Sequence, residues 1–571
     1  MVDATWTADQ PATHDYRAGP IDRLGWAWML VPLAILATSI AAVVVNYSAA
    51  PWMDLWEPLN TYRHVLANGL SFGDLWAQHN EHRIVFPKLI FLADLHWFSG
   101  AAVLELVLIF ATQALAALLF LKLAELRTAR FWDLAATAAA VGFMFSLGQW
   151  ENLFWGFQIQ FVAVFAAGAW AIHLFSRATE PANGLRLGLA LAALSLLVFA
   201  TFNMANGVFA GAAMAIAAFV ARRGKFAIIA PAVASVTLLA IYMADYVQVA
   251  YHSPPSLALQ HPARYVTYVL AYLGSPWAER PMQAAAVGLV GVLSTLAMTW
   301  AVFRDRAVSS NRLTLFAVVL FVGITASATA LGRLSFGLEQ AISTRYATPA
   351  FYFWGAQLVF WSVFTRDGLE RRPRAALGLV SLVALALLAP TQRVSAIHLA
   401  MVHEGILAGE SALIGQVDDP EALMSLYPRP EVLVAMADFA RSQGLAPFHR
   451  PPPPALDPRR IANGPTHCLG ALDGARPSTA PGFGRAAGWA WDVAAGKPVE
   501  RLLVSGGGGR ILGVGVGGTR RRDVDTALPV VTHGRTGWTA AIQMAAGEEL
   551  AAFAVLQDGR LCEVGHWRSP S

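Results

Sequence analysis

The chain has 571 residues, of which 56% are hydrophobic and 14% are charged, and its formal net charge is +4. Ordinary soluble domains carry roughly a quarter charged residues, so this composition excludes a soluble enzyme and indicates an integral membrane protein. The Lys and Arg residues gather in short loops, so we interpret the positive charge as a topology signal and not as a nucleic-acid-binding surface.

The N-terminal 25 residues are polar and are predicted to form a cytoplasmic tail. The apolar run from Trp26 to Val45 has no small-residue cleavage site before Pro51, so we expect a retained first helix. A span needs about 20 apolar residues, and residues 26–390 are predicted to form an α-helical transmembrane domain of about 11 helices. The predicted spans are 26–46, 101–121, 134–148, 159–175, 186–202, 207–221, 226–244, 283–303, 312–331, 347–364 and 375–390.

The distribution of basic residues between the loops predicts the orientation. Lys and Arg are dense in the short loops that would be cytoplasmic, and sparse in the longer loops on the other side. We therefore expect a multi-pass membrane protein with a cytoplasmic N-terminus and a C-terminal domain on the outer face. The residue usage, rich in Ala, Gly and Arg, indicates a bacterium, so the expected location is the inner membrane with the C-terminal domain in the periplasm.

The first outer loop, residues 48–100, places two carboxylates directly after the first span. Asp54 and Glu57 are three residues apart and would share one face of a helix. A carboxylate at this position can act as a general base on an acceptor hydroxyl if its pKa suits the working pH, although a solvated surface pair is the alternative. Asp54 and Glu57 are our candidate catalytic residues.

A second cluster in this loop holds His79, Glu81, His82 and Arg83. Imidazole and carboxylate groups are ligands of zinc and manganese, and a guanidinium suits a phosphate. The spacing matches no standard zinc motif, so metal binding by the first three residues, substrate hydrogen bonding and structural capping all stay open. A divalent metal (Mg or Mn) is a candidate cofactor.

Polar residues also mark the later outer loops. Ionisable groups at membrane depth are costly and usually line a cavity or a path. Arginines there could hold a phosphate or pyrophosphate leaving group, and snorkelling to native phospholipid explains them equally well. The candidate substrate-binding residues are Glu81, His82, Arg83, Glu151, Asn152, Gln158, Arg264, Arg333, Arg345 and Tyr346.

Hydropathy falls after Pro390, and residues 391–464 are predicted to form a helical and proline-rich extracytoplasmic linker. Helices should start at Pro420 and Pro430, because proline is favoured at the first helical position. From 465 to 571, short alternating segments between glycine turns predict a small all-β sandwich.

Two features of this C-terminal domain bear on its function. Aromatic motifs around Trp489, Trp491 and Trp538 leave open whether they bind carbohydrate or pack in the core. Cys468 and Cys562 would form a disulfide if the domain lies outside the cytoplasm, and two unpaired buried thiols are the alternative.

Residues 20 to 400 resemble the GT-C class of membrane glycosyltransferases, which use polyprenyl-phosphate sugars at the extracytoplasmic face. The resemblance rests on Asp54 after the first span, the many helices, Arg345 before a late span, the outer C-terminal domain, and the runs 78–83 and 149–160. It implies an inverting transfer in which Asp54 deprotonates the acceptor hydroxyl. Arg83, Arg333 or Arg345 would then hold the leaving phosphate.

The chain departs from the class at one point, since many members have adjacent acidic residues or a D-x-D-like pair in this loop. The wider spacing of Asp54 and Glu57 leaves open the metal dependence and the identity of the base. Two further functions also stay open, namely a transporter or flippase of a lipid-linked substrate and an oligosaccharide ligase or polymerase. The predicted partners are membrane lipid, a polyprenyl-phosphate sugar donor and a cell-envelope glycan acceptor such as lipopolysaccharide, with no nucleic acid.

Overall fold

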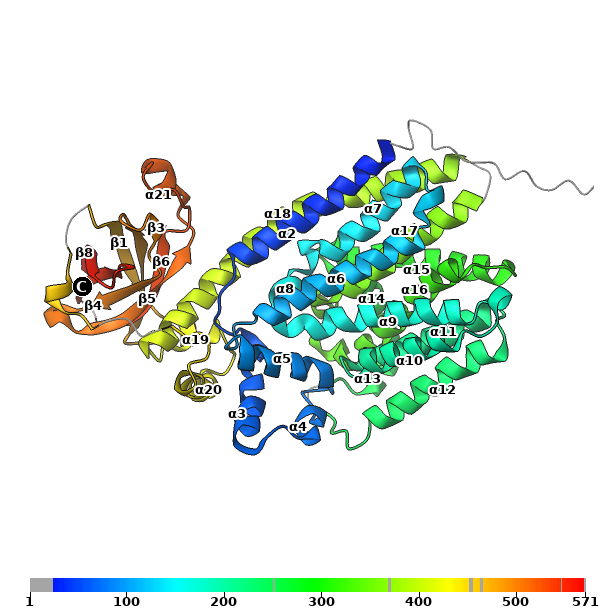
Figure 1. The fold of residues 1–571 in the computed structure, drawn as a ribbon, viewed down its shortest axis with the longest axis horizontal. Coiled ribbons are helices and arrows are strands. Elements are labelled where there is room, and N and C mark those ends of the chain that lie inside the picture. Colours follow the sequence, from blue (N-terminus) through cyan, green and yellow to red (C-terminus); the bar gives the residue numbers. More distant parts are fainter. Residues whose placement is uncertain are drawn as a thin grey trace, which may run out of the picture.

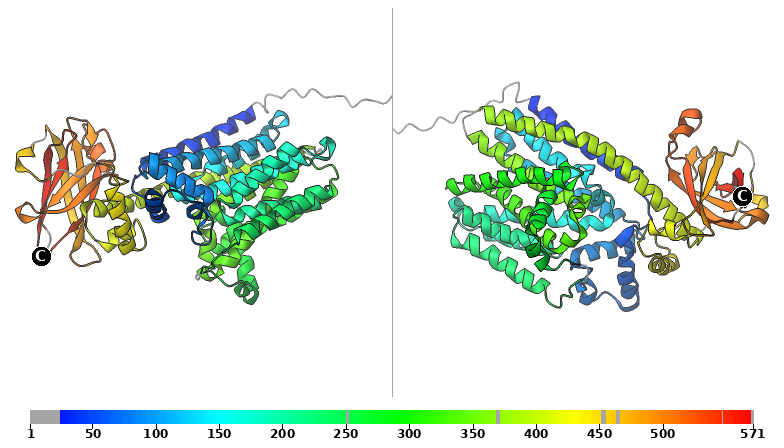
Figure 2. Two further views of the ribbon diagram at one scale, coloured as in Figure 1. Left: turned by 60° about the horizontal axis from the view of Figure 1, so that its bottom comes forward. Right: turned by 180° about the vertical axis from the view of Figure 1, so that it is seen from behind.

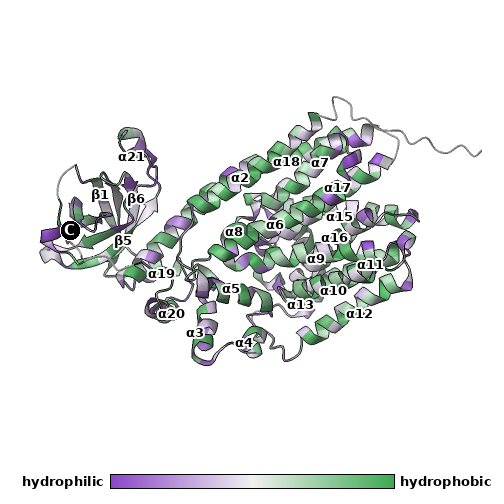
Figure 3. Cartoon of the chain, viewed as in Figure 1, coloured by the Kyte–Doolittle hydropathy of each residue, from purple (hydrophilic) through white to green (hydrophobic). Residues whose placement is uncertain are grey.

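The computed structural model describes residues 24–249, 252–367, 371–450, 455–462, 466–545 and 547–568. A bundle of long helices forms one end of the molecule, and a β domain at the far end is carried on one extended helix (Figure 1). The turned views show the same separation of bundle and β domain (Figure 2). Hydrophobic residues predominate along the bundle helices, as expected for segments surrounded by lipid (Figure 3).

Every predicted span corresponds to a helix. These helices are α2 (Leu30–Val45), α6 (Val103–Leu123), α7 (Phe131–Phe145), α9 (Ile159–Ala178), α10 (Leu187–Thr201), α11 (Val208–Val220), α12 (Lys225–Tyr242), α15 (Pro281–Arg304), α16 (Ser310–Arg333), α17 (Ala347–Asp367) and α18 (Arg371–Gly415). Among the described residues, eight helical stretches are long and apolar enough to cross a membrane, and two shorter apolar helices correspond to α10 and α11. The prediction of a polytopic α-helical membrane protein is confirmed.

Small residues let the bundle helices approach closely, which is the usual way to pack helices in lipid. A Cβ added at Gly274 of α14 (Pro262–Gly274) would lie 1.9 Å from the Ala284 carbonyl oxygen of α15. A Cβ at Gly288 of α15 would lie 1.9 Å from the Leu270 carbonyl oxygen of α14. The two helix backbones therefore touch where only glycine fits.

Helix α18 continues through Pro390 and ends at Gly415, so the prediction that a linker of short helices begins directly after Pro390 is wrong. Proline removes one backbone donor, but the side chains around it hold the helix in place. The Gln392 amide donates to Ser39 Oγ of α2 at 2.9 Å and to Thr38 Oγ1 at 3.0 Å. These contacts anchor α18 to α2 just beyond the proline, and the continuous helix reaches the β domain.

The segments outside the bundle are short helices. The first outer loop contains α3 (Pro58–Asn68), α4 (Phe72–Trp76) and α5 (Val85–Trp97). After α18, helices α19 (Pro420–Met424) and α20 (Pro430–Ser442) begin at the two predicted prolines.

The strands of the C-terminal domain pair antiparallel, and its described residues also include a 3-10 turn (Gly507–Gly509) and one short α-helix, α21 (Arg522–Ala527). The strands are β1 (Cys468–Pro477), β2 (Phe483–Asp492), β3 (Lys497–Pro498), β4 (Arg501–Ser505), β5 (Ile511–Thr519), β6 (Gly537–Gln543), β7 (Glu549–Val555) and β8 (Leu561–Arg568). In the described residues they form one continuous sheet, in the order β1-β2-β6-β5-β4-β7-β8 with β3 on β2, instead of two separate packed sheets. The sheet curls so that the edge strands β1 and β8 meet, and a disulfide joins Cys468 to Cys562 there.

The sheet packs against the C-terminal end of α18. Ser411 Oγ donates to the Val514 carbonyl of β5 and accepts from the Ala541 amide of β6, both at 2.7 Å. The aromatic platform proposed for sugar is not formed by Trp491 or Trp538, because these side chains are 2% and 1% exposed. Burial in the core leaves no ring face for a pyranose.

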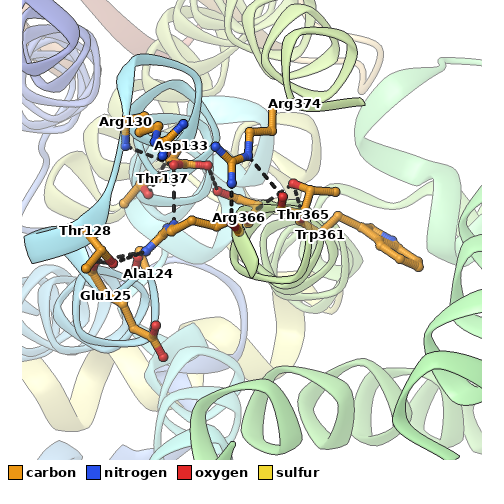
Figure 4. Close-up of polar contacts among 11 residues, drawn as sticks. Ala124, Glu125, Thr128, Arg130, Asp133, Thr137, Trp361, Thr365, Arg366 and Arg374 are labelled. Atoms are coloured by element: carbon orange, nitrogen blue, oxygen red, sulfur yellow. Dashed lines mark hydrogen bonds and ion pairs between the residues drawn. The ribbon is translucent and has the colours of Figure 1, made fainter. Parts of the chain in front are cut away.

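A polar cluster closes the opposite end of the bundle, where α6, α7, α17 and α18 meet (Figure 4). Asp133 of α7 is 2% exposed; its Oδ2 lies 3.3 Å from Arg366 Nε, and its Oδ1 accepts from Ser362 Oγ at 2.8 Å. Arg366 also donates to the Ala124 and Glu125 carbonyls, both at 3.0 Å. This buried pair ties together helix ends that are far apart in the sequence.

Candidate functional site

The polar segments predicted to share the outer face are brought together by direct contacts. The Gln78 side chain donates to the Val247 carbonyl at 2.8 Å and accepts from the Val247 amide at 3.0 Å. Asn152 donates to the Arg345 carbonyl at 2.8 Å, and Arg333 pairs with Glu81. Three later loops therefore converge beside the first outer loop.

Asp54 lies in the 3-10 turn Met53–Trp56, directly after the first span. Met53 has φ +50°, a left-handed conformation that non-glycine residues seldom adopt, and its amide donates to the Leu426 carbonyl at 2.7 Å. The turn is thus held by the segment that follows α19. Its conformation presents the Asp54 carboxylate half-buried, without a hydrogen bond or ion pair to any described residue.

The surroundings of Asp54 raise its pKa to about 6. Burial is the main cause, because it disfavours the charged form, and the carboxylates of Glu57 and Glu81 act in the same direction. The Arg345 guanidinium opposes them. An unpaired carboxylate whose pKa lies near neutral pH is suited to accept a proton from a hydroxyl.

Glu57, the second candidate carboxylate, is engaged by neighbouring side chains. Tyr427 donates to Glu57 Oε1 at 3.0 Å, and His79 Nδ1 lies 3.3 Å from Glu57 Oε2. Arg429 in turn donates to the Tyr427 hydroxyl at 2.9 Å. Tyr427 and Arg429 were not predicted from the sequence, because Tyr427 lies 370 residues beyond Glu57 and no motif marks either residue.

Glu81 is the centre of a second group. It pairs with Arg333, and its Oε1 lies 3.6 Å from the Nε2 atoms of both His82 and His252. Burial lowers the pKa of His82 to about 4, so this imidazole is neutral at physiological pH even though Glu81 favours the charged form. His252 was not among the predicted site residues, although it is a titratable side chain in an outer loop.

Arg345 is held by a network centred on Glu151. Glu151 Oε2 accepts from Thr344 Oγ1 at 2.6 Å and from the Arg345 amide at 3.0 Å. Arg345 Nη2 lies 3.7 Å from Glu151 Oε1, which is beyond hydrogen-bond distance. Its terminal Nη groups make no hydrogen bond to a described residue, and the side chain is 35% exposed. The backbone is therefore fixed while the guanidinium keeps donors to offer.

The predicted site residues Asn152 and Tyr346 support this network from below. Asn152 also donates to Thr348 Oγ1 at 2.7 Å. Tyr346 is 6% exposed, and its ring lies 4.9 Å from that of Tyr272. Both residues position the Arg345 turn and have little surface of their own for a substrate.

Three predicted substrate-binding residues lie elsewhere. Arg83 is 2% exposed and donates to the carbonyls of Trp76, Tyr242 and Ala244. The Arg83 guanidinium therefore connects loops through these hydrogen bonds and has no exposed donors for a phosphate. The prediction that Arg83 holds a phosphate is wrong. Arg264 is exposed at the start of α14 without a described partner, and Gln158 is 1% exposed behind the loop.

The metal candidates His79, Glu81 and His82 do not form a ligand set. They occupy a tight turn in which the His79 and His82 backbones bond to each other at 2.8 Å. The side chain of His79 faces Glu57 while that of His82 faces Glu81. Among the described residues, no three His, Cys, Asp or Glu side chains are grouped to hold a metal ion.

Comparisons with known proteins give distant similarity. No protein-family model matches the chain, and no curated protein matches it. Among solved structures it is similar to "Crystal Structure of ArnT from Cupriavidus metallidurans bound to Undecaprenyl phosphate", with 12% identity and a TM-score of 0.36, covering 74% of this chain and 76% of that one. The apo form of the same protein aligns with 12% identity and a TM-score of 0.29, covering 60% and 77%.

Proposed function

We propose that this chain is an inverting membrane glycosyltransferase, which moves a sugar from a polyprenyl-phosphate donor to a glycan or glycolipid of the bacterial cell envelope. The observation that carries the proposal is Asp54, an unpaired and half-buried carboxylate at the end of the first span with a pKa of about 6. It is consistent with the role that the GT-C resemblance of the sequence implies.

The reaction can be written with the residues at this site. Asp54 takes the proton of the acceptor hydroxyl, and the acceptor oxygen attacks the anomeric carbon from the side opposite the leaving group. The bond between this carbon and the lipid phosphate breaks, and the phosphate leaves with the electron pair. Inversion follows from this single displacement.

The leaving phosphate carries negative charge that must be stabilised. The terminal Nη donors of Arg345 make no hydrogen bond to a described residue, and Arg333 lies on the same face beside Glu81. Guanidinium groups suit phosphate oxygens in charge and geometry. We assign Arg345 as the principal phosphate contact and Arg333 as a second.

The reaction would occur on the extracytoplasmic side. The concentration of Lys and Arg in the opposite loops supports this orientation. So does the Cys468–Cys562 disulfide, because disulfides persist in oxidising compartments such as the periplasm.

The test is a mass profile of envelope glycans and glycolipids from cells lacking the gene, complemented with wild type or with Asp54→Asn at matched protein level. We expect a missing sugar that wild type restores, and a rate in membranes about 10²–10⁴-fold lower for Asp54→Asn. Asp245→Asn is the matched control, because Asp245 is an exposed outer carboxylate without a described partner.

Two outcomes would contradict the proposal. An unchanged glycan profile in the deletion strain would point to transport instead of transfer. Full rescue by Asp54→Asn would keep the glycan function but remove Asp54 as the base.

A further inference from the structure

A cavity of about 490 Å³ lies where the first span meets the C-terminal domain, outside the site described above. Its floor consists of apolar residues from the last turns of α2 and from α18, namely Ala41, Ala42, Val45, Ala396 and Ala400. Its rim comes from the loop around α21, which lies on the side of the β domain that faces these helices (Figure 1).

The rim is basic. Arg520, Arg522 and Arg535 line it together with His533, and Asp525 is the one carboxylate among the described lining residues. Arg535 is tied to the membrane domain, because it donates to Asn46 Oδ1 at 2.6 Å and to the Gly518 carbonyl at 2.9 Å. The described lining of this cavity therefore holds three guanidinium groups and one carboxylate.

The three consecutive arginines at 520–522 differ in whether their side chains form ion pairs. The middle one, Arg521, is neutralised inside the domain by Asp473 and by Asp523, with Nη2 2.7 Å from Asp523 Oδ2. Arg520 and Arg522 are exposed and make no ion pair or hydrogen bond with a described residue through their side chains. No described carboxylate lies within ion-pair distance of these two arginines, which both line the cavity.

The cavity lies at the end of an apolar stretch long enough to span a membrane, which is where phospholipid headgroups are expected. The apolar stretch Gly25–Val45 ends there, and the chain leaves the first span at Asn46. The neighbouring surfaces of α2 and α18 are apolar and open, with Val44 66%, Val394 56% and Met401 58% exposed. An acyl chain can follow these surfaces down from the cavity while a charged headgroup stays at its rim.

We propose that this cavity binds an anionic membrane phospholipid of the leaflet next to the C-terminal domain. Its phosphate would lie among Arg520, Arg522 and Arg535, and its acyl chains would lie against α2 and α18. The bound lipid would fasten the β domain to the membrane surface. The inference does not depend on the proposed reaction, because no residue of the Asp54 site lines the cavity.

The test is native mass spectrometry of the full chain, purified in detergent and titrated with phosphatidylglycerol or phosphatidylcholine. Each arginine near a membrane surface contributes roughly a fivefold factor to anionic lipid binding, so Arg520→Gln with Arg522→Gln should weaken phosphatidylglycerol binding about 30-fold. Arg459→Gln with Arg460→Gln is the matched control, since these two arginines are adjacent, exposed and outside the cavity.

A second variant acts in the opposite direction. Asp525→Asn removes the one carboxylate at the rim and should tighten phosphatidylglycerol binding about fivefold. A gain in binding cannot come from misfolding, so this variant separates a binding site from a general effect on stability.

Three results would overturn the proposal. The first is equal binding of phosphatidylglycerol by wild type and the Arg520 and Arg522 variant. The second is equal affinity of wild type for phosphatidylcholine, which would mean that only acyl chains are held. The third is displacement of phosphatidylglycerol by equimolar inorganic phosphate, which would indicate a site for free phosphate.

Discussion

Each end of the helical bundle has an aspartate near an arginine. The two aspartates differ in their burial and in the number of hydrogen-bond and ion-pair partners of their carboxylates. Asp133 is buried, accepts hydrogen bonds from Ser362 and the Arg130 amide, and faces Arg366 at 3.3 Å. Asp54 is half-buried without a described partner and is influenced by Arg345 through space.

This difference indicates that Asp133 has a structural role and that Asp54 is a candidate catalytic residue. A buried carboxylate whose oxygens are all hydrogen-bonded or ion-paired holds helices in place and has no oxygen left to contact a substrate. A carboxylate left without partners in a partly desolvated position is costly to keep and has a raised pKa, which is the pattern found at functional sites. Asp54 is such a carboxylate, and it lies where the loops of the first site converge.

The largest expected effect is a loss of thermal stability when the buried Asp133 is changed. Asp133→Asn leaves the Arg366 guanidinium buried without its counter-charge, and breaking a buried pair in this way costs about 3–5 kcal/mol. We expect a clear loss of thermal stability in detergent. Asp438→Asn is the control, because the Asp438–Arg441 pair is exposed and worth less than about 1 kcal/mol. Equal melting temperatures for Asp133→Asn and wild type would show that the pair is not structural.

The second prediction concerns pH. The pKa of Asp54 is raised to about 6, so the carboxylate is ionised above this pH and protonated below it. A general base works in its ionised form, so the transfer rate should fall about tenfold per pH unit below pH 6 and level off above it. Rates in membrane vesicles measured against pH would reveal this limb. A rate that stays constant down to pH 4 would exclude Asp54 as the titrating base.

The smallest expected effect is a shift of the acidic side of the pH–rate profile, in opposite directions for two variants. Glu57→Gln removes a negative charge that raises the pKa of Asp54, so the limb should move to lower pH. Arg345→Gln removes the opposing positive charge and should move it to higher pH. Each shift should be below about 1 pH unit, because both charges act through partly solvated surroundings. Shifts of the same sign in the two variants would contradict the assignment.

Much of the fold followed from local patterns. The eleven apolar runs became helices, and the two prolines at 420 and 430 began helices as predicted. The short alternating segments after 465 became antiparallel strands. Pro390 was misread as a helix end because its effect depends on Gln392 and α2, which a local pattern does not include.

The site was less accessible from the sequence. The sequence identified four residues whose loops the structure brings together, because ionisable side chains are uncommon beside membrane spans. These residues are Asp54, Glu81, Arg333 and Arg345. Arg83 was assigned to a phosphate because its sequence neighbours are polar, whereas its guanidinium is surrounded by the Trp76, Tyr242 and Ala244 carbonyls. The type of a residue indicates what it can bind, and the packing around it determines what it does bind.

The membrane-embedded bundle, the helix positions and the all-β character of the C-terminal domain could be read from the chain alone, because hydropathy and periodicity are properties of consecutive residues. Which carboxylate stays unpaired depends on the folded arrangement. Glu57 is engaged by Tyr427 from a segment 370 residues away, and no described side chain reaches Asp54 in this way. Charge pairing depends on distances in space, and a chain that crosses a membrane repeatedly brings distant segments within reach of one another.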